Sequence, residues 1–154
     1  MKAGTLKRIM NIWPPYLGAG IKVREISPDY RRVVVALRQK WYNRNYVGTH
    51  FGGSLYSMVD PFYMLMLIHI LGKDYLVWDK FACIEFASPG RGTVTAEFTL
   101  DDSQIEKIKQ ETAVCEKYIA ELPVEITNAD GEIVAKATKH LYVRLKKRVC
   151  QPGE

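Results

Sequence analysis

Cysteine is scarce in this sequence and is not arranged as in a metal or redox site. The three cysteines, Cys83, Cys115 and Cys150, lie far apart, and no pair has the spacing typical of zinc or thioredoxin-like sites. Their odd number and wide separation favour a reducing compartment, with Cys83 and Cys115 as small apolar residues of the core. We therefore expect no disulfide and no metal site, and no residue pattern indicates another cofactor.

Long apolar runs are also absent. The longest uncharged apolar run, residues 61–71, is shorter than the roughly 18 residues that a membrane-spanning helix needs. Residues 1–20 lack the apolar segment and the small-residue cleavage site of a signal peptide. These absences predict a protein that neither spans a membrane nor is exported, and we expect it in the cytoplasm.

Glycine and proline are too few for a collagen-like or low-complexity chain, at 11 and 7 of 154 residues. Hydrophobic residues make up 47% and charged residues 25%, which excludes intrinsic disorder. The excess of basic residues is small, since 22 Lys+Arg against 17 Asp+Glu leave a net charge of +5. No nucleic-acid-binding motif is present, and the basic residues are not interleaved with aromatic ones, so a nucleic-acid partner is not expected.

The chain is expected to form one domain over residues 1–154, because no internal repeat or linker divides it. Residues 1–19 are predicted to be an N-terminal extension whose helix, 5–12, ends at the two prolines that follow. Residues 20–147 would form the core of the domain, and residues 148–154 a tail.

Two further helices are expected. The segment 54–71 is apolar on nearly every side, which predicts a buried helix, and Pro61 should bend or break it. Residues 104–115 carry many charges and follow acidic residues that suit a helix N-terminus, so this helix should lie on the surface. Strands are predicted at 20–26, 31–40, 75–87, 93–100, 116–127 and 132–146.

A helix that is apolar on all sides must be enclosed by other elements. The predicted strands are joined mainly by hairpin turns, of which the Asp130-Gly131 step is the clearest. A curved antiparallel sheet of about six strands, wrapped around the helix at 54–71, satisfies both requirements. The sequence therefore predicts an α+β fold with one buried helix, an N-terminal helix and an inserted surface helix.

Residues able to do chemistry are concentrated in the window 45–60. Gly52 and Gly53 precede the buried helix, where free backbone N–H groups can hold an oxyanion. Asp60 lies about 10 Å further along the helix axis and suits a general base or a nucleophile. If it is buried without partners, its pKa should be raised. Alternatively, Asp60 only caps a second short helix that begins at Pro61.

This window resembles the signature of hotdog-fold thioesterases, Asn-x-x-Gly-x-x-His-Gly-Gly followed seven residues later by Asp. The matching positions are occupied without a gap by Asn45, Gly48, Gly52, Gly53 and Asp60. The order of strands around one apolar helix is also similar to that fold, and the resemblance covers most of residues 20–147. The N-terminal extension and the helix at 103–115 are similar to a little-characterised bacterial branch of these proteins.

The resemblance implies a hotdog fold and hydrolysis of an acyl-CoA or another acyl thioester. Asp60 would activate water or attack directly, and the N–H groups near Gly52 and Gly53 would hold the oxyanion. Asn45 and His50 would position the carbonyl group or the water. The remaining candidate substrate contacts are Phe51, Ser57 and Arg91, the last of which would meet the CoA phosphates.

The resemblance also implies a homodimer or a tetramer. Asp60 is too far along its own helix to reach an oxyanion held at Gly52 and Gly53. In the hotdog family, the carboxylate of one subunit faces the glycine-rich helix start of the other. The active unit would then contain two composite sites.

Two features leave alternatives open. The family's histidine position is Phe51 here, with His50 one residue earlier, which favours a protein that binds acyl thioesters without hydrolysing them or uses the fold only to oligomerise. The basic run 144–148 is either a second contact for CoA phosphates or a solvated strand end. The sequence does not select an acyl group.

Overall fold

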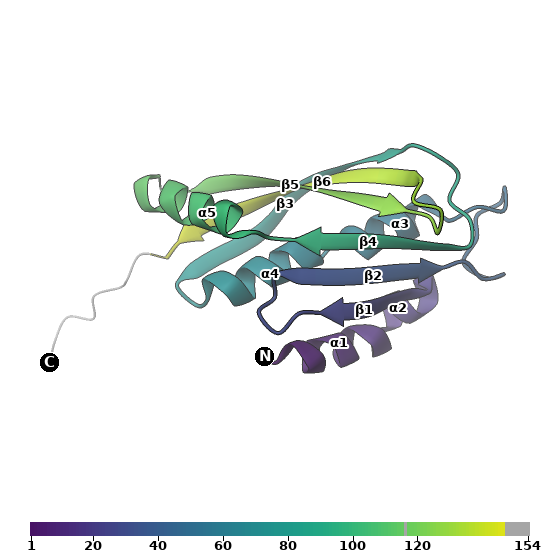
Figure 1. Ribbon diagram of the computed structural model, residues 1–154, viewed down its shortest axis with the longest axis horizontal. Coiled ribbons are helices and arrows are strands. Elements are labelled where there is room, and N and C mark those ends of the chain that lie inside the picture. Colours follow the sequence, from purple (N-terminus) through teal and green to yellow (C-terminus); the bar gives the residue numbers. More distant parts are fainter. Residues whose placement is uncertain (116, 147–154) are drawn as a thin grey trace, which may run out of the picture.

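The computed structural model describes residues 1–115 and 117–146, which form one antiparallel sheet and five helices (Figure 1). The sheet has six strands in the order β1-β2-β4-β5-β6-β3. This confirms the α+β hotdog architecture. In chain order the elements are α1 (Ala3–Ile12), α2 (Pro14–Ala19), β1 (Ile21–Ile26), β2 (Arg32–Arg38), α3 (Gly52–Val59), α4 (Phe62–Leu71), β3 (Tyr75–Phe86), β4 (Thr93–Thr99), α5 (Asp102–Val114), β5 (Tyr118–Thr127) and β6 (Ile133–Leu145).

Helices α3 and α4 lie along one face of the sheet, and the core fills the space between them and the strands (Figure 1). On α4, Phe62, Met66 and Leu67 are almost completely buried. By length and composition alone, the helical stretch Gly52–Leu71 could cross a membrane, but half of it is buried inside this fold. Its apolar character is therefore explained by the core it fills.

The central helix is broken at Asp60 and Pro61, as the proline predicted. Pro61 stands at the cap position of α4, and no side chain caps that helix. The Asp60 carboxylate accepts a hydrogen bond from Lys139 instead. The alternative in which Asp60 acts as a helix cap is therefore wrong, although two short helices do meet there.

The N-terminal extension contains one helix more than expected. Pro14 and Pro15 end α1 but also begin α2, because proline fits the first turn of a helix. On α1, the side chain of Asn11 accepts from the backbone N–H of Val23 and donates to its carbonyl. Strand β1 is an edge strand, and the extension thus provides hydrogen-bond partners for part of its free backbone edge.

The placement of the cysteines in the core was wrong. Cys83 is exposed on β3, where it lies opposite Thr138 on the side of the sheet turned away from the helices. Cys115 is exposed at the C-terminal end of α5. Both are free thiols. The tail 148–154 and part of the basic run 144–148 lie outside the described residues.

Candidate functional site

The N-terminus of α3 presents two backbone N–H groups without a protein acceptor. Ser54 and Leu55 donate to the carbonyl of Phe51, whereas the amides of Gly52 and Gly53 find no acceptor within residues 1–115 and 117–146. At a helix N-terminus these groups also carry the positive end of the helix dipole. The geometry therefore suits an oxyanion or a carbonyl oxygen.

A cleft of about 440 Å³ opens beside this helix start, and its lining includes His50, Gly52 and Phe86. The His50 side chain is buried, with Nε2 3.1 Å from the carbonyl of Gly92 and Nδ1 without a partner. Burial lowers the pKa of His50, and the contact with Gly92 only partly offsets that effect. Burial thus favours the neutral form of the His50 imidazole, and its Nδ1 atom is buried without a hydrogen-bond partner in the described residues.

Asn45 organises the loop that carries His50. Its Oδ1 accepts from the backbone N–H of Thr49, and its Nδ2 donates to the Thr49 hydroxyl and to the His50 carbonyl. From the neighbouring turn, Arg91 donates to the carbonyl of Gly48. Asn45 and Arg91 thus lie next to the cleft, and both stabilise its loop.

Two aromatic rings lie against the glycines at the helix start. A Cβ atom on Gly52 would stand 3.0 Å from the ring of Phe86, and one on Gly53 would stand 2.4 Å from the ring of Phe51. Either glycine lets an aromatic ring approach the backbone more closely than any other residue would. The rings give the helix start an apolar wall, as an acyl chain would require.

At the other end of α3, Asp60 belongs to a cluster of three charged residues. The Nζ atom of Lys139 is 3.0 Å from Oδ1 of Asp60 and also bonds the carboxylate of Asp79. The Lys139 side chain is 0% exposed, whereas that of Asp60 is 50% exposed. Asp60 is therefore neither buried nor unpaired, and the condition that the sequence analysis attached to it is not met.

The cluster is held by tertiary structure. Asp79 follows the buried Val77 on the inner face of β3 and lies opposite Leu141, two residues from Lys139 on the same face of β6. Burial by itself would lower the pKa of Lys139, but the hydrogen bonds to Asp79 and Asp60 raise it. Lys139 is thus a buried cation held between two carboxylates.

A cavity of about 180 Å³ lies beside Asp60, lined also by Tyr16, Tyr56 and Ser57. Burial, with a contribution from the negative charge of Asp60, raises the pKa of Tyr16, whose hydroxyl donates to the Ser57 carbonyl. The Ser57 hydroxyl donates to the carbonyl of Gly53 rather than to Asp60. This cavity and the cleft at Gly52 share no lining residue.

The predicted site residues therefore form two groups within one chain. Near the start of α3 the structure brings together the candidates Asn45, His50, Phe51, Gly52, Gly53 and Arg91. Near its end lie Ser57 and Asp60. About 10 Å of helix separates Gly53 from Asp60.

The sequence analysis missed Lys139 and Asp79. A signal for Lys139 was present, because it occupies an inward position of β6, in line with Ala135, Ala137 and Leu141. A charged residue at an inward position of an apolar alternation requires a partner. The signal for Asp79 was weaker, because the bulge in β3 changes which residues face inward.

Comparison with known protein families assigns the chain to one of them. The chain matches the domain of unknown function DUF4442 over residues 3–143, and it belongs to that family. No curated protein matches it.

Solved structures resemble the whole chain. A protein of unknown function from Pseudomonas aeruginosa, called a probable thioesterase, has a TM-score of 0.81 at 18% identity and covers 94% of this chain and 97% of its own. A thioesterase from Haemophilus influenzae has a TM-score of 0.69 at 13% identity and covers 98% of this chain and 96% of its own. A protein of unknown function from Chlorobaculum tepidum has a TM-score of 0.71 at 16% identity, with 94% of each chain covered.

At these identities the similarity establishes the fold alone. The chain is a protein of the DUF4442 family, and its hotdog fold is similar to that of these structures.

Proposed function

We propose that the protein hydrolyses an acyl thioester, with an acyl-CoA as the substrate class. One observation carries the proposal: the Asp60 carboxylate is half-exposed and is held by the buried Lys139, on the same helix whose N-terminus presents the free amides of Gly52 and Gly53. A base and an oxyanion site are the two elements that thioester hydrolysis requires.

In the proposed reaction, Asp60 takes a proton from water as the water attacks the thioester carbonyl. The resulting oxyanion is stabilised by the N–H groups of Gly52 and Gly53. Collapse of the tetrahedral intermediate breaks the C–S bond, and protonated Asp60 returns the proton to the leaving thiolate. Lys139 bonds Oδ1 of Asp60, which leaves Oδ2 for the water.

The proposal includes a homodimer, because one chain keeps the two halves of the site apart. Strand β3 is the other edge of the sheet and pairs only with β6 among the described residues. Exposed apolar side chains on it include Trp78, Phe81 and Phe86. A second copy that pairs along this strand would extend the sheet and cover these side chains. We propose that Asp60 of one protomer there meets Gly52 of the other.

The signature of hotdog thioesterases supports this assignment at Asn45, Gly48, Gly52, Gly53 and Asp60. Phe51 replaces the family's histidine. In this structure the buried His50 supplies an imidazole at the same cleft. We propose that His50 orients the thioester carbonyl or the water.

The substitution Asp60→Asn tests the proposal. It keeps the shape of the side chain and removes the base, so hydrolysis should fall by roughly 10²–10⁴-fold. The measurement is thiol release from a panel of short, medium, long and aromatic acyl-CoAs. The matched control is Asp130→Asn, in an exposed turn where Asn and Asp are equally suitable. Unchanged hydrolysis by Asp60→Asn would remove Asp60 from the reaction.

A second candidate function is binding of an acyl thioester without hydrolysis. The observation that favours it is the position of the Phe51 ring against Gly53, where the family has an imidazole. The same acyl-CoA panel separates the two functions. Binding measured by calorimetry without thiol release from the wild-type protein would support the second candidate and contradict the first.

A further inference from the structure

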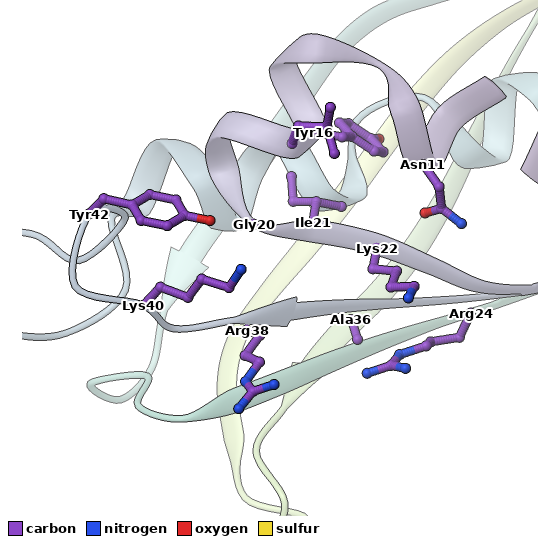
Figure 2. Close-up of a pocket in the computed structure, with 11 residues that line it drawn as sticks. Asn11, Tyr16, Gly20, Ile21, Lys22, Arg24, Ala36, Arg38, Lys40 and Tyr42 are labelled. Carbon is purple, nitrogen blue, oxygen red and sulfur yellow. The ribbon is translucent and has the colours of Figure 1, made fainter. Parts of the chain in front are cut away.

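A basic groove lies on the outer side of β1 and β2, on a different part of the molecule from the Gly52 cleft (Figure 2). Its volume is about 440 Å³, within the range of small-molecule sites. The charged residues that line it are Lys22, Arg24, Arg38 and Lys40, and neither Asp nor Glu lines it. We infer that this groove binds the phosphate groups of a nucleotide that carries two or more phosphates.

The strand register explains why these cations gather. Lys22 lies opposite Ala36, and Arg38 follows two residues later on the same face of β2. Ala36 is only 4% exposed, so its small side chain forms the floor between the longer basic ones. Figure 2 shows these basic side chains around the hollow, with Tyr42 at one end.

The groove cations are not neutralised by the protein. None of the four forms an ion pair within the part of the chain that the structure describes. Arg32 provides the contrast. It stands on the same face of β2 as Arg38, but it bonds both Glu25 and Glu97 at 2.6 Å. Clustered like charges repel one another, and a bound anion removes that repulsion.

One end of the groove is held in place by hydrogen bonds between the Asn43 side chain and the backbone. The Nδ2 group of Asn43 donates to the carbonyls of Ala19 and Arg38, and its Oδ1 accepts from the N–H of Lys40. Gly20 has a φ of +80°, and a Cβ there would stand 2.3 Å from Asn43. These contacts hold the end of β2 and the segment after it, which carry Arg38 and Lys40, against the end of α2.

An aromatic side chain stands at the end of the groove next to Lys40. Tyr42 is 45% exposed, and Nζ of Lys40 lies 5.5 Å from the centre of its ring. Trp41 packs edge-on against the same ring. A planar base could stack there while its phosphates reach the cations, which favours a nucleotide over inorganic phosphate.

Tyr16 lines both the groove and the cavity beside Asp60. If the proposed function holds, the nucleotide is the adenosine end of coenzyme A. That identification rests on the proposed function, whereas nucleotide binding does not. In that case the groove, and not Arg91, contacts the CoA phosphates.

The test is calorimetric titration of the protein with adenosine 3′,5′-bisphosphate, which has no thioester bond for the proposed reaction to hydrolyse. Binding should be saturable and should weaken by about tenfold or more in Lys22→Gln/Arg38→Gln, because each cation makes a charge-assisted hydrogen bond. The matched control, Lys107→Gln/Lys117→Gln, removes the same charge from exposed positions elsewhere and should leave affinity unchanged.

Three results would overturn the inference: no binding, an equal loss in both double variants, or tripolyphosphate binding as tightly as the nucleotide. The last would indicate a surface for polyanions in general. If Asp60→Asn hydrolyses acyl-CoA like wild type while Lys22→Gln/Arg38→Gln loses nucleotide binding, only the proposed function is contradicted. Hydrolysis without nucleotide binding in the groove would contradict only this inference.

Discussion

At the scale of single residues, Lys139 is the side chain on which the site depends. It is completely buried and is bonded to two carboxylates, Asp60 and Asp79. Removing one member of such a cluster leaves its partners without their counter-ion. Changing Lys139 and Asp79 together avoids only part of that cost, because Asp60 still loses its counter-ion.

We predict that Lys139→Met lowers the free energy of unfolding by about 1–3 kcal/mol. The double variant Lys139→Met/Asp79→Asn should recover part of the loss, because it removes one of the two like charges left behind. Urea unfolding measures both. The control on the same strand is Lys136→Met, whose pair with Glu125 is half-exposed and should contribute little. Equal effects at positions 136 and 139 would contradict the role of the buried cluster.

His50 makes stability depend on pH in a defined window. Burial holds its pKa below the usual value, so the folded protein binds its proton less readily than the unfolded chain does. Its contribution is therefore fully present above pH of about 6.5 and is lost as pH falls through the folded pKa. We predict that the free energy of unfolding of the wild type falls as pH is lowered from about 6.5 to the folded-state pKa of His50.

His50→Gln should show a smaller drop, because Gln does not titrate and can still donate to Gly92. Urea unfolding at a series of pH values measures the difference between the two proteins. Both retain His69 and His140, so the comparison isolates position 50. Parallel curves for the two proteins would show that His50 is not buried as a neutral ring.

At the scale of elements, the first turn of α3 is the proposed oxyanion site. Phe51 has the extended backbone that must precede a proline, and Gly52 is the first helical residue, where proline is tolerated. Gly52→Pro therefore deletes one free N–H group and keeps the helix.

We predict that Gly52→Pro lowers hydrolysis by roughly 10²–10³-fold, as loss of an oxyanion donor does. Thiol release measures the rate, and circular dichroism checks that the helix is retained. Gly52→Ala is the control, because it adds a Cβ against Phe86 but keeps the N–H group. If both variants lose activity equally, the contact with Phe86 explains the effect and the amide does not.

At the scale of the whole molecule, the separation of Asp60 from the glycine-rich helix start predicts a composite site. Asp60→Asn and Gly52→Pro chains should each be inactive as homodimers. After the two are unfolded and refolded together in equal amounts, about a quarter of wild-type activity should return. The reason is symmetry: half of the dimers are mixed, and each mixed dimer has one intact site.

Sedimentation should show a dimer at micromolar concentration for each of these proteins. A mixture that stays inactive, while sedimentation confirms that mixed dimers form, would contradict the composite site. A wild-type protein that is both active and monomeric would contradict it independently.

The sequence by itself determined the fold class and one half of the site. Alternating strands and a helix that is apolar on all sides predict a sheet that covers the helix. Pro61 cannot continue a helix without a break. The Gly52-Gly53 pair marks a helix start for the same local reason. These features depend on neighbouring residues, so the chain order alone makes them visible.

Only the tertiary structure decided what Asp60 contacts, where the cysteines lie and how the basic residues are distributed. Asp60 and Lys139 are 79 residues apart, and the alignment of β3 with β6 brings Asp79 to the same lysine. Cys83 faces outward because the register shift after Asp79 places it opposite Thr138. Likewise, Lys22 and Arg38 stand next to one hollow because two strands pair in a particular alignment. Pairing register is a property of distant segments, and composition and local periodicity do not specify it.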